Sequence, residues 1–182
     1  MDKYRIEIED TLFFMVDIQE RLVPAMEANR KVVNNSLILL KSAEELEIDA
    51  IATEQYPKGL GGSLEELKEY IDEESIFEKI EFTGCIYEVR EYLRESGKEN
   101  IVLFGMETHV CVYQTVRDLL DLEYNVFVVS DAVASRTREN KEVALDLLRD
   151  MGAKITSTET ILFDLIKEAG TDRFKFISGL IK

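Results

Sequence analysis

Short apolar runs of strand length alternate with amphipathic segments along the chain, and this alternation limits the possible folds more than any other feature of the sequence. The apolar runs cover residues 12–16, 49–53, 75–78, 101–104, 126–130 and 154–156. Most of them place β-branched and aromatic residues side by side without polar alternation, which is typical of strands buried on both faces of a sheet. The sequence therefore predicts a parallel sheet covered by helices.

The segments between these runs have the periodicity of amphipathic helices. Residues 30–47 place apolar side chains such as Leu37 and Leu40 three or four positions apart, on one helical face. Further helices are expected over residues 63–70, 86–95, 110–122 and 139–151. Ser63 opens the first of these through a Ser-x-x-Glu capping box, and Gly152 caps the end of the last. Strands and helices that alternate in this way are joined by right-handed crossovers, which place helices on both faces of the sheet.

A chain of 182 residues has the size of one ordinary domain, and no linker or internal repeat divides it. Its hydrophobic content of 46% is sufficient for a single core. We therefore expect one domain over residues 1–182. Its fold class is expected to be α/β, with a doubly wound, mostly parallel sheet between two layers of helices.

The chain is strongly acidic, with 37 Asp and Glu residues against 22 Lys and Arg residues and a formal net charge of -15. Such a surface repels phosphate backbones and anionic lipid headgroups, which argues against nucleic acid and membranes as partners. The two cysteines, Cys85 and Cys111, form neither a disulfide framework nor a CxxC motif. The N-terminal residues lack the pattern of a secretion signal, and no apolar run approaches the ~20 residues of a membrane helix. We therefore expect a cytoplasmic protein.

Three chemically complementary side chains follow three of the predicted strands. Asp17 comes directly after the first apolar run, Lys79 follows the third, and Cys111 lies in the segment after the fourth. Open parallel sheets bind their ligands beyond the carboxyl ends of the strands, so these side chains are expected near one another. A carboxylate that accepts the thiol proton and a cation that stabilises the thiolate are what a nucleophilic cysteine requires.

Cys111 has the local sequence of a residue at the start of a helix. Thr108 is expected to cap a helix that begins near His109, which places Cys111 in the first turn, where free backbone N–H groups favour an anion. The same N–H groups would hold an oxyanion during acyl transfer. The residues alone leave simpler alternatives open: Cys111 as a small buried hydrophobe, Asp17 as a helix cap, and Lys79 as a solvated partner of a neighbouring glutamate.

Six segments of the sequence carry motifs that are specific in combination. They are VDIQ (16–19), TEQYPKGLG (53–61), EKIEFTGC (78–85), GMETHVCVYQTVRDLL (105–120), VFVVSDAVASR (126–136) and GAKITSTETILFDL (152–165). In this order they resemble the isochorismatase-like cysteine hydrolases, and the resemblance extends from about residue 11 to 166. The segment after the second strand is most similar to the metal-free branch of that family.

The resemblance implies a Cys–Asp–Lys catalytic triad of Cys111, Asp17 and Lys79. In this family the Asp is the general base, the Lys polarises the pair, and the thiolate attacks a carbonyl carbon to give an acyl-enzyme that water then hydrolyses. The family also has a cis peptide bond before the nucleophile, which here falls between Met106 and Glu107. The backbone N–H groups of Glu107 and Cys111 would then form the oxyanion hole.

Departures from the family pattern bear on cofactor and substrate. Nicotinamidases of this superfamily bind a metal through an Asp and several His residues after the second strand, where this chain has Glu54 and Gln55 but no histidine. We therefore expect no metal and no other cofactor. Isochorismatases proper lack the nucleophilic cysteine, so Cys111 argues against vinyl-ether hydrolysis.

The resemblance also implies a small-molecule substrate and a homo-oligomer. Gln55 and Tyr56 lie where the family's pocket wall would be, and they are expected to contact the substrate. His109, the one histidine of the chain, is a further candidate contact, with a partly exposed bystander as the alternative. Cys85 is expected to be buried and less reactive than Cys111.

These expectations combine into one function and two alternatives. We expect a metal-independent cysteine hydrolase that cleaves a C–N bond, amide or ureido, of a small molecule through a Cys111 thioester. A binding or scaffolding protein without turnover is the first alternative, because a fold does not establish function. A redox-sensing thiol is the second, since an activated cysteine at a helix start is readily oxidised.

Overall fold

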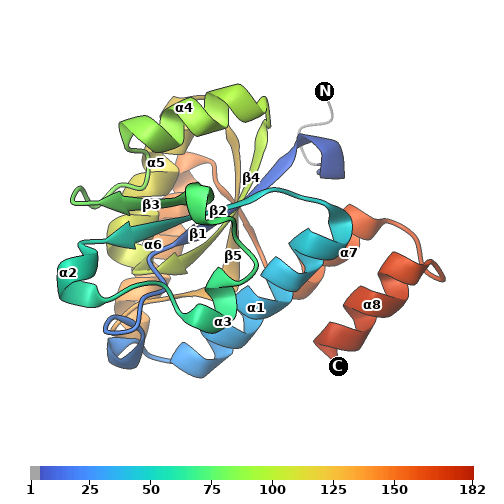
Figure 1. The fold of residues 1–182 in the computed structure, drawn as a ribbon, viewed down its shortest axis with the longest axis horizontal. Coiled ribbons are helices and arrows are strands. Elements are labelled where there is room, and N and C mark those ends of the chain that lie inside the picture. The colour runs from blue at the N-terminus through green and yellow to red at the C-terminus, as the bar shows by residue number, and fades with distance from the viewer. Residues whose placement is uncertain (1–4) are drawn as a thin grey trace.

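The computed structural model describes residues 5–182, and its centre is a six-stranded sheet (Figure 1). The strands are β1 (Thr11–Val16), β2 (Ala50–Gln55), β3 (Ile76–Lys79), β4 (Asn100–Met106), β5 (Asn125–Ala134) and β6 (Lys154–Thr156). Their order is β3-β2-β1-β4-β5-β6, and every neighbouring pair is parallel. The winding direction reverses between β1 and β4, and open parallel sheets bind ligands at such a reversal. Part of the N-terminal segment in which no secretion signal is expected, residues 1–4, lies outside the described residues.

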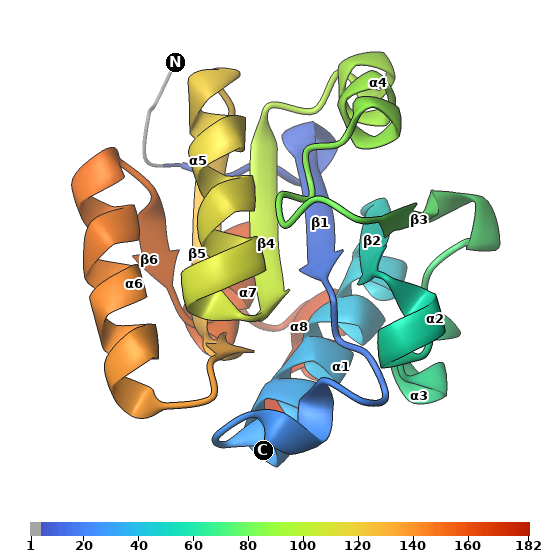
Figure 2. The same ribbon diagram turned by 90° about the vertical axis from the view of Figure 1, so that its left-hand side faces the viewer.

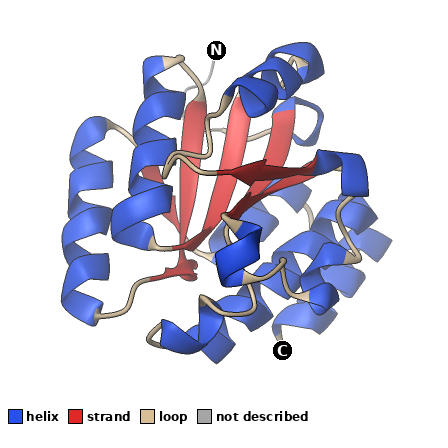
Figure 3. Ribbon diagram, turned by 60° about the vertical axis from the view of Figure 1, so that its left-hand side comes forward, coloured by secondary structure: helices blue, strands red, loops and turns tan. Residues whose placement is uncertain are grey.

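Helices cover both faces of the sheet (Figure 2, Figure 3). They are α1 (Asn29–Leu46), α2 (Pro57–Leu60), α3 (Glu65–Lys68), α4 (Tyr87–Ser96), α5 (Tyr113–Asp121), α6 (Arg138–Met151), α7 (Thr158–Ile166) and α8 (Asp172–Ile181). One face packs against α1, α3 and α7, with α8 lying against α1 and α7, and the other face packs against α4, α5 and α6 (Figure 1). This arrangement confirms the predicted doubly wound α/β fold. No helix within residues 5–182 is long and apolar enough to cross a membrane.

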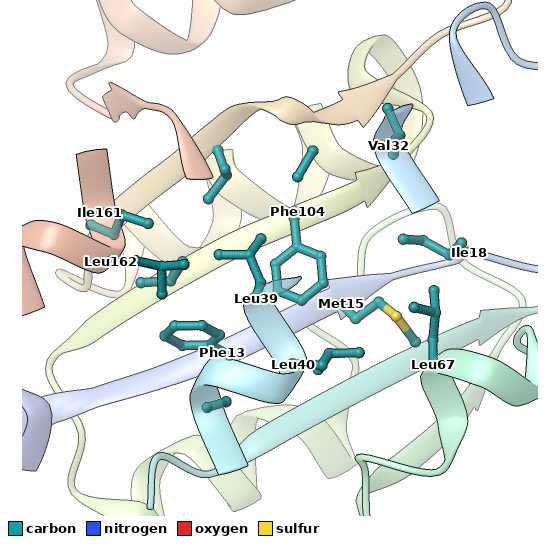
Figure 4. Packing of buried hydrophobic residues seen from close by; sticks show 14 of the residues in the cluster. Phe13, Met15, Ile18, Val32, Leu39, Leu40, Leu67, Phe104, Ile161 and Leu162 are labelled. Atoms are coloured by element: carbon teal, nitrogen blue, oxygen red, sulfur yellow. The ribbon is translucent and has the colours of Figure 1, made fainter. Parts of the chain in front are cut away.

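Two apolar clusters, one on each face, hold the helices against the sheet. On the α1 side, Phe13 and Phe104 pack edge to face with ring centroids 6.4 Å apart, in the same cluster as Leu39 (Figure 4). Successive residues of β1 alternate between the clusters, so that Phe13 faces α1 whereas Phe14 belongs to the opposite cluster. All six residues of β1 are buried. Burial on both faces explains why this strand is a continuous apolar run, since each large side chain contributes about 1.5–3 kcal/mol.

Two predicted boundaries are wrong. Ser63 does not cap a helix: it pairs with Gln19 in an isolated antiparallel bridge, and α3 begins two residues later without a side-chain cap. The backbone N–H of Ser63 donates to the Glu54 carboxylate at 2.7 Å, which ties this position to the end of β2 instead. β5 continues beyond residue 130 to Ala134, with a shift in its register against β4. Gly152 ends α6 in the left-handed conformation, as predicted.

Gly105 lies where β4 passes close to the end of β1, and an alanine there is expected to destabilise the fold. Its φ is +133°, and an added Cβ atom would lie 2.0 Å from the carbonyl oxygen of Val16. Because that backbone leads directly into Asp17, it cannot move without disturbing the strand end. We expect Gly105→Ala to lower the free energy of unfolding by about 3 kcal/mol or more, measured by urea denaturation. The control is Gly97→Ala, because Gly97 also has a positive φ but open space around it; equal losses in the two variants would contradict the close-contact argument.

Candidate active site

Three strand ends bring Asp17, Lys79 and Cys111 together. Asp17 follows β1 directly, Lys79 is the last residue of β3, and Cys111 lies in a π-helical turn, Thr108–Val112, that follows β4. These strands lie within the neighbouring set β3-β2-β1-β4, so their carboxyl ends meet at one edge of the sheet. The Lys79 Nζ atom is 2.7 Å from Asp17 Oδ2, and the Cys111 thiol lies beside this pair, with Sγ 4.0 Å from the Gln55 Oε1 atom that also accepts from Lys79.

Asp17 is fully buried, and its carboxyl group is held from several sides. Its backbone has a φ of +52°, and its N–H donates to the Thr53 carbonyl at 3.1 Å. The Oδ1 atom accepts from the Thr53 hydroxyl at 2.8 Å, and Oδ2 accepts from Lys79. Burial raises the pKa of this carboxyl group, and the charge and hydrogen bond of Lys79 offset the rise in part. A buried carboxylate with a raised pKa is suited to accept a proton from a nearby thiol.

The Lys79 ammonium has oxygen atoms on several sides. Besides Asp17, it donates to Gln55 Oε1 at 2.7 Å, and the backbone carbonyls of Glu81 and Phe82 lie 3.3 and 3.2 Å away. An ammonium has three hydrogens and no acceptor, so these oxygens account for its donor capacity. The side chains of Lys79 and Asp17 are both 0% exposed. The alternatives of a solvated lysine and of an aspartate that caps a helix are therefore wrong.

The turn that carries Cys111 is wider than the expected helix start. Glu107 is the residue before the turn, and its carbonyl accepts from the N–H groups of both Val110 and Val112. Thr108 lies inside the turn, where its buried side chain makes no capping hydrogen bond. The prediction that Thr108 caps a regular α-helix here is therefore wrong, and α5 begins only after this turn.

The Cys111 thiol is buried beside the Asp17 carboxyl group, and these two effects raise its pKa to about 12. The charge of Lys79 and a hydrogen bond from the backbone N–H of Glu107 act in the opposite direction but are outweighed. Lys79 therefore favours the thiolate, as expected, but burial and Asp17 outweigh it, so the net shift of the Cys111 pKa is upward rather than downward. The resting site instead holds a thiol next to its proton acceptor.

Alkylation of Cys111 by iodoacetamide is expected to be slow at neutral pH and to accelerate about tenfold for each pH unit up to at least pH 10. The reason is that the reactive thiolate fraction grows tenfold per pH unit below the thiol pKa. The measurement uses a Cys85→Ser background, because Cys85 is a second buried thiol whose pKa burial raises to about 12. A rate that reaches its plateau at or below pH 8.5 would contradict the raised pKa.

Two residues between β5 and α6 hold the turn before the nucleophile. Arg136 donates from Nε to Glu107 Oε2 at 3.0 Å, and its backbone N–H is 3.3 Å from the same oxygen. The Ser135 hydroxyl lies 2.9 Å from His109 Nδ1. The peptide bond between Met106 and Glu107 is cis, as the family resemblance implies. The Glu107 side chain is thus bound by the β5–α6 connection.

Gln55 and Tyr56 lie at the end of β2, next to the ion pair. Gln55 Oε1 accepts from Lys79 and is 4.0 Å from Cys111 Sγ, and its Nε2 donates to the Ile80 carbonyl at 2.8 Å. Tyr56 is 53% exposed and lines, together with Lys79, an open cavity of about 710 Å³ between α2 and the start of α4. Cys111 is not among the residues that line this cavity. The cavity therefore borders the Lys79 side of the site.

Sequence reasoning missed two residues that link these groups. Thr115 Oγ1 donates to the Cys111 carbonyl at 2.6 Å and accepts from the Gly84 N–H at 2.6 Å, which joins the nucleophile's turn to the segment after Lys79. Its position four residues after the cysteine is the signal that could have found it. Gln19, the last residue of the VDIQ motif, is fully buried and contacts the end of β2.

The arrangement has the parts needed for acyl transfer. A thiol, a carboxyl group that can take its proton and a fixed ammonium lie close together at one edge of the sheet. Within residues 5–182, no group of three or more His, Cys, Asp and Glu side chains is placed to hold a metal ion.

Comparisons with known proteins agree with one another. A family model described as Isochorismatase domain matches residues 11–160. Isochorismatase family protein 1A of Dictyostelium discoideum is 40% identical over 175 residues, covering 93% of this chain and 85% of that protein. A solved structure described as MAR1 ribonuclease from Caenorhabditis elegans is 36% identical with a TM-score of 0.92, covering 97% of this chain and 92% of that one. The ycaC gene product of Escherichia coli, described as an octameric hydrolase of unknown specificity, shares the fold with a TM-score of 0.90 at 22% identity, covering 98% and 89% of the two chains.

Proposed function

The chain belongs to the isochorismatase family of hydrolases, and we propose that it is a metal-independent cysteine hydrolase that cleaves an amide or ureido C–N bond of a small molecule. The observation that carries the proposal is the buried ion pair of Asp17 and Lys79 with the Cys111 thiol beside it, joined to Lys79 through Gln55 Oε1. These groups supply a nucleophile, a proton acceptor and a fixed positive charge at one point.

In the first half-reaction, Cys111 Sγ attacks the substrate's carbonyl carbon while Asp17 accepts the thiol proton. The negative charge moves from sulfur to the carbonyl oxygen, where the backbone N–H groups of Glu107 and Cys111 donate to it. The C–N bond then breaks, the leaving amine takes the proton from Asp17, and a thioester remains on Cys111. Lys79 stays charged and stabilises the ionised carboxylate before and after each transfer.

In the second half-reaction, water attacks the thioester carbon while Asp17 accepts one of its protons. The carbon–sulfur bond breaks, the acid product leaves, and Asp17 returns the proton to the sulfur of Cys111. The raised pKa of Asp17 supports this role, because a carboxyl group that both accepts and donates protons works best with a pKa nearer to the working pH. Gln55, Tyr56 and His109 are proposed to contact the substrate.

RNA cleavage, which the name of the C. elegans relative suggests, is less well supported for this chain. A formal net charge of -15 repels the phosphate backbone of a long RNA. The other alternative is a binding protein without turnover, which would release no product from any compound that is tested.

We further propose that the chain acts as a single domain over residues 1–182 in a cytoplasmic homo-oligomer. The E. coli protein with the same fold is described as an octamer, which supports a homo-oligomer for this chain. Light scattering on the purified protein measures the oligomer, and a monomeric mass would contradict this part of the proposal.

A screen of small amides and ureido compounds for released amine or ammonia tests the proposed function, with an RNA oligonucleotide as a parallel substrate. We expect turnover of at least one C–N substrate and, after a rapid acid quench, an increase in intact-protein mass equal to the acyl group. Turnover with no acyl adduct would contradict the thioester, and cleavage of RNA alone would replace the proposed substrate class. If no compound is turned over, the binding-protein alternative is favoured.

A further inference from the structure

The buried side chain of Gln19 connects the end of β1 to the end of β2. Its Oε1 accepts from the Gln55 N–H at 2.8 Å, and its Nε2 donates to the carbonyls of Gln55 and Gly61 at 3.0 and 2.7 Å. The backbone N–H of Gln19 donates to the Asp17 carbonyl at 3.0 Å. One fully buried residue therefore contacts the backbones of both Asp17 and Gln55.

The backbone partners determine which way the Gln19 carboxamide is turned. An N–H group can only donate and a carbonyl can only accept, so the Gln19 oxygen faces the Gln55 N–H and the Gln19 nitrogen faces the two carbonyls. A glutamate at this position would keep the acceptor but lose both donors. A buried carbonyl without its donor is costly, so glutamine is the side chain that satisfies all three groups.

Gln55 connects this contact to the ion pair. Its Nε2 donates to the Ile80 carbonyl, so its Oε1 is turned toward Lys79 Nζ at 2.7 Å. The same Nζ lies 2.7 Å from Asp17 Oδ2. The ammonium is thus bound between the Gln55 carboxamide and the Asp17 carboxylate, and the backbone that carries Gln55 is bound by Gln19.

We infer that Gln19 is a positioning residue, which acts through the backbone and carboxamide of Gln55 to hold the Lys79 ammonium against the Asp17 carboxylate. The inference rests on the proposed function, because it takes this ion pair as the one that serves Cys111. The charge of Lys79 favours the Cys111 thiolate, against the effects of burial and of Asp17. Displacing the ammonium would therefore leave less thiolate at a given pH.

A double-mutant cycle of Gln19→Glu and Gln55→Leu tests the inference in a Cys85→Ser background. The measurement is the rate of Cys111 alkylation by iodoacetamide at pH 8, which requires no substrate. We expect each single variant to slow alkylation by about threefold or more, equivalent to half a pKa unit, and the double variant to be no slower than Gln55→Leu. If Gln19→Glu does not fold, Gln19→Met, which keeps the length without the charge, takes its place.

Urea denaturation of the same proteins separates positioning from a purely structural role. Gln19→Glu should lower the free energy of unfolding whether residue 55 is Gln or Leu. The reason is that Gln55→Leu leaves the backbone partners of Gln19 in place. The matched control is Leu93→Ala, a fully buried residue of α4, which should lower stability but change the alkylation rate by less than about twofold. The inference is overturned if Gln19→Glu behaves like Leu93→Ala, or if the effects of Gln19→Glu and Gln55→Leu on alkylation multiply.

Failure of this inference and failure of the proposed function give different results. Amide turnover together with unchanged alkylation in Gln19→Glu would overturn the inference alone. Coupled alkylation effects without turnover of any amide would support the positioning role and count against the hydrolase.

Discussion

Replacing Cys111 with alanine is expected to abolish hydrolysis of the protein's C–N substrate, with kcat falling by about 10⁴-fold or more. Without the thiol no thioester can form, and the Asp17 carboxyl group has no thiol proton to accept. Amine release measured with excess enzyme over substrate detects even slow residual turnover. The matched control is Cys85→Ala, because Cys85 is also buried but bonds to the Thr115 carbonyl and not to the ion pair; it should retain turnover.

Cys111→Ala is also expected to fold, so that loss of activity can be assigned to chemistry. The change removes one sulfur atom from a side chain that is 5% exposed, and it leaves the Asp17–Lys79 pair in place. Circular dichroism and urea denaturation measure this directly. Turnover retained by the folded Cys111→Ala variant would exclude Cys111 as the nucleophile.

Lys79→Met is expected to lower the free energy of unfolding by about 3–5 kcal/mol at pH 8, since it leaves the Asp17 carboxylate buried without its partner. Turnover should fall by about 10²–10⁴-fold, because without the ammonium the ionised Asp17 that accepts the thiol proton is no longer stabilised. Urea denaturation and amine release measure the two effects. The double variant Asp17→Asn/Lys79→Met removes the unpaired charge, so it should recover most of the stability and none of the turnover.

The loss of stability in Lys79→Met should depend on pH. Burial already raises the pKa of Asp17 above its ordinary value of 3.8, and removing Lys79 raises it further. When the pKa of a group is higher in the folded state than in the unfolded state, the group contributes most to the free energy of unfolding at pH values below its unfolded-state pKa. That contribution is lost as the pH rises through its folded-state pKa. The difference between wild type and Lys79→Met should therefore be smaller near pH 4 than at pH 8, and an equal difference at both would contradict this account.

The sheet could be predicted because its strands are buried on both faces. The continuous run at residues 12–16 identifies β1 (Thr11–Val16), and the run at 154–156 matches β6 at both ends. Two C-terminal helices were not predicted. Both helices are short; in α7 three of the polar residues lie together in the first turn, and in α8 Ile177 is the buried residue, so neither has a strong amphipathic pattern.

The candidate site could be located in part for a simple geometric reason. Parallel strands bring their carboxyl ends to one edge, so Asp17, Lys79 and Cys111 could be placed near one another from the strand assignments alone. Local patterns failed at Thr108 and Ser63. Each has a sequence suited to a helix cap, but Ser63 pairs with Gln19 from a distant segment, and Thr108 lies inside the π-helical turn.

The sequence by itself determined which chemical groups follow which strands. The apolar runs identify the strands, and parallel strands place the residues that follow them at one edge of the sheet. Only the tertiary structure decided the protonation state of the thiol. Burial and the nearby Asp17 carboxylate raise the Cys111 pKa more than Lys79 lowers it, and these opposing effects depend on distances across three strands. The tertiary structure also decided which buried groups satisfy one another. Gln19 bonds to a residue 36 positions away and Thr115 to one 31 positions away, and such partners are set by packing, because a buried polar group must find a partner wherever the fold provides one.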